Sequence, residues 1–222
     1  YCCVLCYKVF QLIYILAKLM KAIIFNSLAW VMLPIMDGFA KYLSTELPVL
    51  QITWARYFFT VVFTFPLMLF FFKKYLVWTD KPKLQLIRGF ILLIANISFF
   101  YSISVISLPK ALTLAFIAPL VVTAFSPIFL GESVGYRRWT AVIIGFIGSL
   151  VVIRPGLVEI NLASLAALGT GIMYGFYLII TRKLSTSDNP LLTLLLTGVV
   201  GAIIATIFVP FVWVSPTFNQ WS

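Results

Sequence analysis

Histidine is absent from this chain of 222 residues, and acidic residues are scarce, with six Asp and Glu in total. Without histidine there is no Ser-His-Asp or Cys-His catalytic arrangement and no histidine-based metal site. The sequence also lacks a G-x-x-x-x-G-K run, which excludes a P-loop for nucleotide phosphates. These absences leave little acid–base equipment, so we expect no enzyme activity, no cofactor and no metal.

Cysteine occurs only three times, at Cys2, Cys3 and Cys6. A structural zinc site needs four ligands, and the rest of the chain does not supply them. We interpret the three thiols as incidental or, alternatively, as palmitoylation sites beside a membrane helix. Met20 is the first methionine, so we treat residues 1–19 as a doubtful N-terminal extension and leave the true start open.

Charged residues make up only 10% of the chain, whereas 63% of the residues are hydrophobic. A soluble domain carries about 25% charged residues, so this chain is predicted to be an integral membrane protein. Its apolar runs are continuous and lack period-two alternation, which favours helices over barrel strands. The sequence predicts an all-α polytopic helical bundle of about seven spans, at residues 22–43, 49–72, 84–107, 109–130, 138–153, 160–181 and 190–214.

The net charge of +10 would suggest nucleic acid binding in a soluble protein. Here the basic residues lie mostly in short segments between apolar runs, which is the pattern of membrane topology. With a cytoplasmic N-terminus, 12 of the 16 basic residues lie inside, Arg88 among them, and Lys41, Lys110 and Arg154 lie outside. Arg56 falls within a span. We therefore predict a multi-pass protein of the cell inner (plasma) membrane with its N-terminus in the cytoplasm, and no nucleic acid partner.

The chain contains a weak internal repeat. Residues 36–39 (MDGF) recur as 173–176 (MYGF), and residues 41–45 (KYLST) recur as 182–186 (RKLST). Five spans separate the matched helices, so the second copy would enter the membrane from the opposite side. This is the inverted-topology repeat of many secondary transporters, and the alternative is chance similarity between apolar helices.

Several motifs resemble the end of an EamA-type repeat of the drug/metabolite transporter superfamily. They are Pro119, the run Phe129-Leu130-Gly131-Glu132-Ser133, the run Gly145-Phe146-Ile147-Gly148, and Ile153-Arg154-Pro155-Gly156. In addition, Asp37, Lys41 and Arg56 are similar to the S-adenosylmethionine-uptake-like branch. The resemblance implies ten spans in two five-helix repeats. Residues 20–156 would then form the first repeat and 157–222 an incomplete second one, so we expect the chain to be C-terminally truncated.

The resemblance further implies a secondary transporter that moves a small organic metabolite, such as an amino acid or an S-adenosylmethionine-like solute, by alternating access. Its partners would be this solute and the lipid bilayer. A non-transporting membrane scaffold, or a truncated remnant of such a transporter, is the alternative. Because no ATP motif is present, transport would be coupled to an ion or solute gradient.

Asp37 and Arg56 are the strongest pair of candidates for a substrate-binding or gating site. Both lie roughly 10–12 Å inside the outer membrane boundary at 1.5 Å per helical residue. A charge at that depth is costly, so it indicates a gate, a substrate contact or, for Asp37, a proton carrier. A structural ion pair, or Arg56 extending outward to the interface, is the alternative. The other candidates are Trp30, Asn96, Tyr101, Thr113, Phe116 and Pro119.

Two further motifs leave alternatives open. Gly171 and Gly175 form a G-x-x-x-G pair, which allows close helix approach inside the protein or in a homodimer. Pro119 frees a carbonyl one turn earlier, which either binds substrate or marks a kink. We expect Glu132 to form a solvated salt bridge with Arg137 or Arg138, or to anchor the topology.

Overall fold

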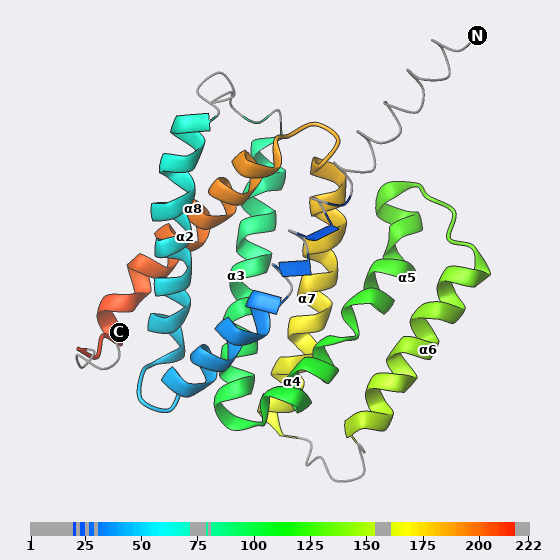
Figure 1. Cartoon of the computed structure of the whole chain (residues 1–222), viewed down its shortest axis with the longest axis horizontal. Helices are drawn as coiled ribbons and strands as arrows, with labels where there is room; N and C mark the ends of the chain where they lie inside the picture. The colour runs from blue at the N-terminus through cyan, green and yellow to red at the C-terminus, as the bar shows by residue number, and fades with distance from the viewer. Residues whose placement is uncertain are drawn as a thin grey trace. The chain divides into compact units, whose positions relative to one another are not determined.

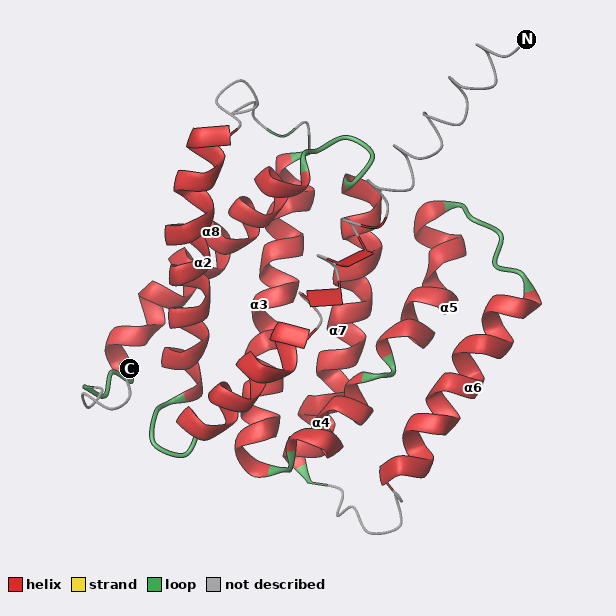
Figure 2. Ribbon diagram, viewed as in Figure 1, coloured by secondary structure: helices red, strands yellow, loops and turns green. Residues whose placement is uncertain are grey.

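The computed structural model describes residues 20, 23–24, 27–28, 31–71, 79, 81–153 and 161–215, which are helical apart from short turns (Figure 2). This part of the chain contains no strand, and the predicted all-α polytopic membrane fold is confirmed. The chain divides into two compact units, Tyr1–Ala40 and Lys41–Ser222. Trp30, Arg154 and the three cysteines lie outside the described residues.

The described helices begin with one that is continuous over residues 31–43. It is followed by α2 (Val49–Phe71), α3 (Pro82–Val105), α4 (Leu108–Ala115), α5 (Ala118–Leu130), α6 (Tyr136–Ile153), α7 (Leu162–Leu184), α8 (Pro190–Phe208) and the 3₁₀ helix η3 (Val209–Phe211). Among the described residues, five segments are long and apolar enough to cross a membrane: α2, α3, α4 with α5, α7, and α8 with η3. The predicted spans 22–43 and 138–153 are not among these five and stay predictions.

The fourth predicted span, 109–130, is a broken helix. Its first part ends at Ala115 and its second begins at Ala118, with Pro119 in the first turn. Proline has no N–H to donate to the carbonyl four residues earlier, which is that of Ala115, so one bond of the regular helical ladder is missing at this point. The Phe116 N–H, at the end of the first part, bonds to the carbonyls of Leu112 and Thr113.

In the second unit, α3 lies at the centre of the packing (Figure 1). It packs most extensively against α7, and also contacts α8 and α2, while α2 pairs with α8. On the other side of α7 lie α4 and α5, and α6 packs against α5. The core contains Phe100, Ile103 and Ile179, each no more than 2% exposed.

At one end of this unit, segments that are distant in sequence contact one another. The Lys41 ammonium donates to the carbonyls of Ile103 and Ile106 at the C-terminal end of α3. The Gln51 side chain donates to the Val214 carbonyl at 2.9 Å and accepts from its N–H at 3.1 Å. The start of α2, the end of α3 and the segment after α8 therefore lie at the same end of the unit.

A second set of contacts joins the opposite ends of these helices. Asp188, in the turn between α7 and α8, accepts from Thr79 at 2.5 Å and from Gln85 at 2.6 Å. Arg182 at the end of α7 pairs with Glu132 after α5 at 2.8 Å. The two sets of ends alternate along the chain, as consecutive membrane spans require.

Candidate functional site

Polar and aromatic side chains gather where α2, α3, α7 and α8 of the second unit pack together. We define the interior site by six of them: Arg56 and Tyr57 on α2, Arg88 and Asn96 on α3, and Tyr174 and Tyr177 on α7. These side chains all belong to helices that cross the membrane, where polar groups must find partners inside the protein.

Tyr57 and Asn96 form a buried contact of the interior site. The Asn96 amide donates to the Tyr57 hydroxyl at 2.7 Å, and Asn96 and Tyr57 are only 8% and 4% exposed. The Tyr57 ring fits because Gly201 of α8 has no side chain, since a Cβ there would overlap the ring. The predicted site residue Asn96 is thus a buried contact between α2 and α3.

Arg56 is half-buried and faces the same region. Its guanidinium carbon lies 5.8 Å from the centre of the Phe100 ring, a cation–π arrangement. It is also close enough to the hydroxyls of Tyr57 and Tyr174 to interact with them electrostatically. The predicted candidate Arg56 therefore contributes positive charge to the interior site.

Arg88, which charge counting placed among the cytoplasmic residues, is a buried side chain of α3. It is only 4% exposed and lies inside α3. Its guanidinium donates to the Thr181 hydroxyl at 2.7 Å, the Thr197 hydroxyl at 2.6 Å, the Thr193 carbonyl at 3.0 Å and the Tyr177 hydroxyl at 2.9 Å. One side chain thus joins α3 to both α7 and α8.

Two tyrosines on α7 lie at the edge of the interior site, where Tyr177 is half-buried and Tyr174 is 37% exposed. The rings of Tyr174 and Tyr177 stack with their centres 5.4 Å apart. The Arg88 guanidinium carbon lies 4.7 Å from the centre of the Tyr177 ring, on which it therefore also makes a cation–π contact. The interior site therefore combines two cations with stacked aromatic rings.

A line of hydrogen bonds connects Arg88 to the turn between α7 and α8. Gln85, one turn earlier on α3, donates to Asp188 at 2.6 Å and to the Thr193 hydroxyl at 3.3 Å. The Thr193 carbonyl in turn accepts from Arg88. Within the described part of the chain, the Gln85 Oε1 atom is buried without a hydrogen-bond partner.

The Asp188 carboxyl, at the outer end of this line, is held in its charged form. Burial by itself would raise its pKa, but hydrogen bonds from Thr79, Gln85 and Ser187 and the nearby Lys81 ammonium outweigh that effect. The pKa of Asp188 therefore lies below its ordinary value.

The structure does not bring the remaining predicted residues to the interior site. Tyr101 and Phe116 are 42% and 56% exposed, and Pro119 is exposed in the first turn of α5. Thr113 is buried, but its hydroxyl donates to the Pro109 carbonyl of its own helix. Asp37 is half-buried on the helix over residues 31–43, in the unit that ends at Ala40. Its meeting with Arg56, which belongs to the other unit, stays a prediction.

Gly171 and Gly175 pack inside the chain. A Cβ at Gly171 would lie 2.6 Å from the Ala115 carbonyl oxygen, and one at Gly175 would lie 2.7 Å from Val121. The G-x-x-x-G pair therefore lets α7 approach the break between α4 and α5, and the carbonyl that Pro119 leaves without its helical partner faces α7. This internal contact accounts for the motif, and a homodimer stays an untested prediction.

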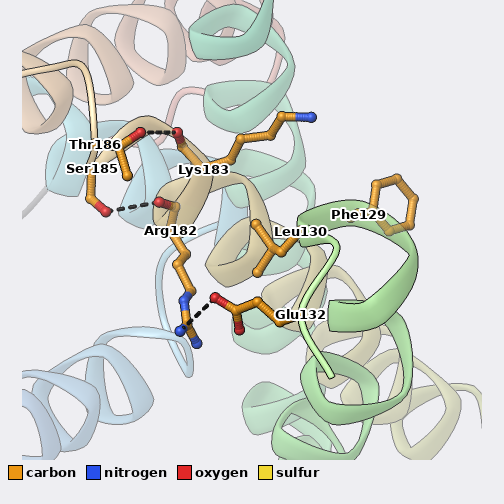
Figure 3. Close-up of a pocket in the computed structure, with 7 residues that line it drawn as sticks. All are labelled: Phe129, Leu130, Glu132, Arg182, Lys183, Ser185 and Thr186. Carbon is orange, nitrogen blue, oxygen red and sulfur yellow. Dashed lines mark hydrogen bonds and ion pairs between the residues drawn. The ribbon is translucent and has the colours of Figure 1, made fainter. Parts of the chain in front are cut away.

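A pocket of about 430 Å³ lies where the ends of α5 and α7 meet (Figure 3). Glu132 and Arg182 form an ion pair on its wall, with side chains 36% and 51% exposed. The salt bridge expected for Glu132 thus exists, but its partner is Arg182 and not Arg137 or Arg138. Gly131 ends α5 in the left-handed conformation, with φ of 69°, and the Glu132 side chain directly after it reaches Arg182 at the end of α7.

Sequence reasoning missed Arg88 and the two α7 tyrosines as site residues. A signal was present for α7, because Tyr174, Tyr177 and Thr181 have the spacing of one helix face. Arg88 could have been noticed from its position inside the predicted span 84–107. Its threonine partners lie roughly 90 to 110 residues away, so no local pattern reveals them.

Comparisons with known proteins agree with this architecture. Residues 19–154 match the model of the EamA-like transporter family. An S-adenosylmethionine uptake transporter of Rickettsia bellii is 25% identical over 83% of this chain and 63% of its own length. The corresponding protein of Rickettsia prowazekii is 24% identical over 86% of this chain and 67% of its own length.

A riboflavin transporter of Vibrio cholerae is 27% identical over 70% of this chain and 53% of its own length. The chain therefore spans between about half and two thirds of the length of these curated relatives. No solved structure matches it. Since the family model covers more than half of the chain, this protein belongs to the EamA-like transporter family.

Proposed function

We propose that this protein is a secondary transporter that moves a small organic metabolite across the inner membrane by alternating access. The observation that carries the proposal is the interior site, where Arg56, Arg88 and stacked tyrosines meet between membrane-spanning helices. Charged groups inside a membrane are costly and characteristically mark a substrate path. The relatives named as S-adenosylmethionine and riboflavin transporters support a metabolite substrate with a ring system that tyrosines can stack on.

Alternating access needs two related halves, and the turns of the chain support such a relation. The Ser44 hydroxyl donates to the Lys41 carbonyl at 2.7 Å, and the Ser185 hydroxyl, 141 residues later, donates to the Arg182 carbonyl at 2.8 Å. The following hydrogen bonds recur with the same spacing, from Thr45 to Tyr42 as from Thr186 to Lys183, and from Leu47 to Leu43 as from Asp188 to Leu184.

The crossing of α2 and α8 supports the same relation. Tyr57 packs against Gly201, and Thr60 packs against Gly198. At the offset of 141 residues, Tyr57 corresponds to Gly198 and Thr60 corresponds to Gly201. The Tyr57–Gly201 contact therefore corresponds to the Gly198–Thr60 contact, with the two helices exchanged. This is what a twofold axis between the two helices would produce, and such an axis relates the halves of an inverted repeat. We therefore propose that residues 20–156 form one repeat and that 157–222 belong to the second.

The proposed orientation places the N-terminus in the cytoplasm. The ends that carry Thr79, Glu132, Arg182 and Asp188 then face the cytoplasm. Removing Arg88 from the cytoplasmic charge count leaves the excess of inside lysine and arginine intact, which is the basis of this orientation.

Flux measurements test the proposal. The complete reading frame that contains this chain would be reconstituted in liposomes, and uptake of labelled S-adenosylmethionine and of riboflavin would be followed. We expect saturable uptake of at least one of them, with exchange against the unlabelled compound. The Arg56→Gln variant should lower this uptake, while Arg137→Gln, an exposed arginine on α6, serves as the matched control. A non-transporting scaffold would show no flux above empty liposomes.

We further propose Asp37 as the protonation site if transport is driven by protons. Asp37 is a carboxylate inside the helix over residues 31–43. The Asp37→Asn variant should then lose the dependence of uptake on external pH while still exchanging labelled for unlabelled substrate. Uptake that keeps its wild-type pH profile in this variant contradicts the assignment.

A further inference from the structure

The positive charge of Arg88 is surrounded by hydrogen-bond partners that are all electrically neutral. Its four acceptors are three hydroxyls and one backbone carbonyl, all neutral, and the side chain is 4% exposed. A guanidinium has five N–H donors, so these four hydrogen bonds leave one donor for another group. A buried cation without a negative partner among the described residues is energetically unfavourable. This indicates that an anion binds to Arg88 during the transport cycle.

Gln85 supplies an open acceptor beside this cation. It lies one helical turn before Arg88 and is only 2% exposed, and both side chains bond to Thr193. Its amide nitrogen is occupied by Asp188 and Thr193, while its Oε1 atom has no partner within the described residues. A buried carbonyl oxygen without a donor costs free energy unless an N–H or O–H reaches it.

Together the two residues match one chemical group. A zwitterionic amino-acid headgroup presents a carboxylate and an ammonium on the same carbon atom. The spare Arg88 N–H and its charge suit the carboxylate, and Gln85 Oε1, on a side chain whose Nε2 bonds to the Asp188 carboxylate, suits the ammonium. The stacked rings of Tyr177 and Tyr174 continue from Arg88 along α7 and offer a surface for the rest of the molecule.

We propose that Arg88 and Gln85 form a subsite for the α-amino-carboxylate group of a zwitterionic substrate, with Arg88 taking the carboxylate and Gln85 the ammonium. This inference rests on the proposed transport function and narrows it. It selects amino-acid-like substrates, among them S-adenosylmethionine, over riboflavin, which has neither a carboxylate nor an ammonium group.

The test compares S-adenosylmethionine with its decarboxylated form, which lacks only the carboxylate. With the wild-type complete protein in liposomes, the KM for the decarboxylated compound should be higher by roughly ten- to a hundredfold, the worth of a charge-assisted hydrogen bond. Arg88→Gln should bring the two KM values together. Gln85→Leu should raise both KM values and keep their ratio, because both compounds carry the ammonium. The control Arg137→Gln should change neither.

The outcomes separate the two proposals. Uptake of riboflavin without uptake of S-adenosylmethionine overturns the subsite and leaves the transport function standing. The same holds if Arg88→Gln keeps the wild-type ratio of KM values. No flux of any of the three compounds overturns the transport function, and the subsite falls with it.

If the Arg88→Gln variant does not fold, a second variant tests the same subsite. Arg88→Lys keeps the positive charge but loses the planar fork that holds several acceptors at once. It should raise the KM for S-adenosylmethionine several-fold and leave that for the decarboxylated compound unchanged. Unchanged values for both compounds in a folded Arg88→Lys protein would overturn the subsite.

Discussion

At the scale of single residues, the interior of the second unit depends on polar groups that satisfy one another. The Asn96 amide and the Tyr57 hydroxyl are both buried and lie 2.7 Å apart. Removing one partner leaves the other without water to replace it. This pair therefore helps to fix how α2 and α3 approach each other.

The Tyr57→Phe variant should destabilise the protein by about 0.5–2 kcal/mol, as one hydrogen bond between membrane helices is worth. Thermal unfolding of the detergent-solubilised protein measures this. A cycle with Asn96→Leu should show coupling, because the second substitution costs less once the first has been made. Tyr101→Phe, on a ring that is 42% exposed, is the matched control. Strictly additive losses in the cycle would show that the hydrogen bond contributes nothing.

Asp188 predicts how the stability of the folded protein depends on pH. Its pKa is lowered in the folded protein by Thr79, Gln85, Ser187 and Lys81, which outweigh the effect of burial. A carboxyl with a lowered folded pKa stabilises the fold above its unfolded pKa of about 3.9, and this stabilisation disappears as the pH falls through the folded value. The wild type should therefore unfold at a higher temperature than Asp188→Asn at neutral pH, and the difference should close below about pH 4. A difference that widens on acidification would contradict the assignment.

At the scale of helices, α7 has glycines at the positions where it packs against the broken helix formed by α4 and α5. Gly171 lies against the Ala115 carbonyl, and Gly175 lies against Val121. Gly171→Ala would place a methyl group 2.6 Å from a backbone oxygen, so α7 and α4 would have to move apart. We expect a loss of about 1–3 kcal/mol, typical of overpacking.

Gly145→Ala on α6 is the matched control for this substitution, since no neighbouring side chain or helix in the described structure lies within 4 Å of where its Cβ would be. It should be neutral or slightly stabilising, because alanine favours a helix over glycine by about 1 kcal/mol. Thermal unfolding of both variants measures the contrast. Equal effects of the two alanines would show that the close approach at Gly171 is not needed.

The helices also show how far the sequence alone could predict this fold. The ranges of α2, α3, α7 and α8 follow from apolar run length, and Pro119 marks the break within 109–130, because these properties are local. The position of Arg88 could not be predicted in this way. Its neighbours Lys81 and Lys83 are exposed, whereas Arg88 is buried by threonines of α7 and α8. The interior site therefore depends on contacts between segments distant in sequence.

At the scale of the whole molecule, the contacts at the helix ends predict which loops share a side of the membrane. The Asp188 turn is joined to Thr79, and Glu132 is joined to Arg182. At the opposite ends, Lys41 is joined to the end of α3. Within the second unit, two sets of loops must therefore face opposite sides, whichever way the protein is inserted.

Single cysteines test this arrangement together with the proposed orientation. Ser133 and Ser187 belong to the first set, and Ser44 and Ser107 to the second, and Ser133, Ser187 and Ser107 are exposed. In a background without Cys2, Cys3 and Cys6, a membrane-impermeant thiol reagent should label Ser44→Cys and Ser107→Cys in intact cells. Ser133→Cys and Ser187→Cys should react only after permeabilisation, because an excess of lysine and arginine keeps their loops in the cytoplasm. Complete reversal of this pattern would overturn the orientation alone, whereas labelling of Ser133→Cys and Ser187→Cys from different sides would overturn the fold.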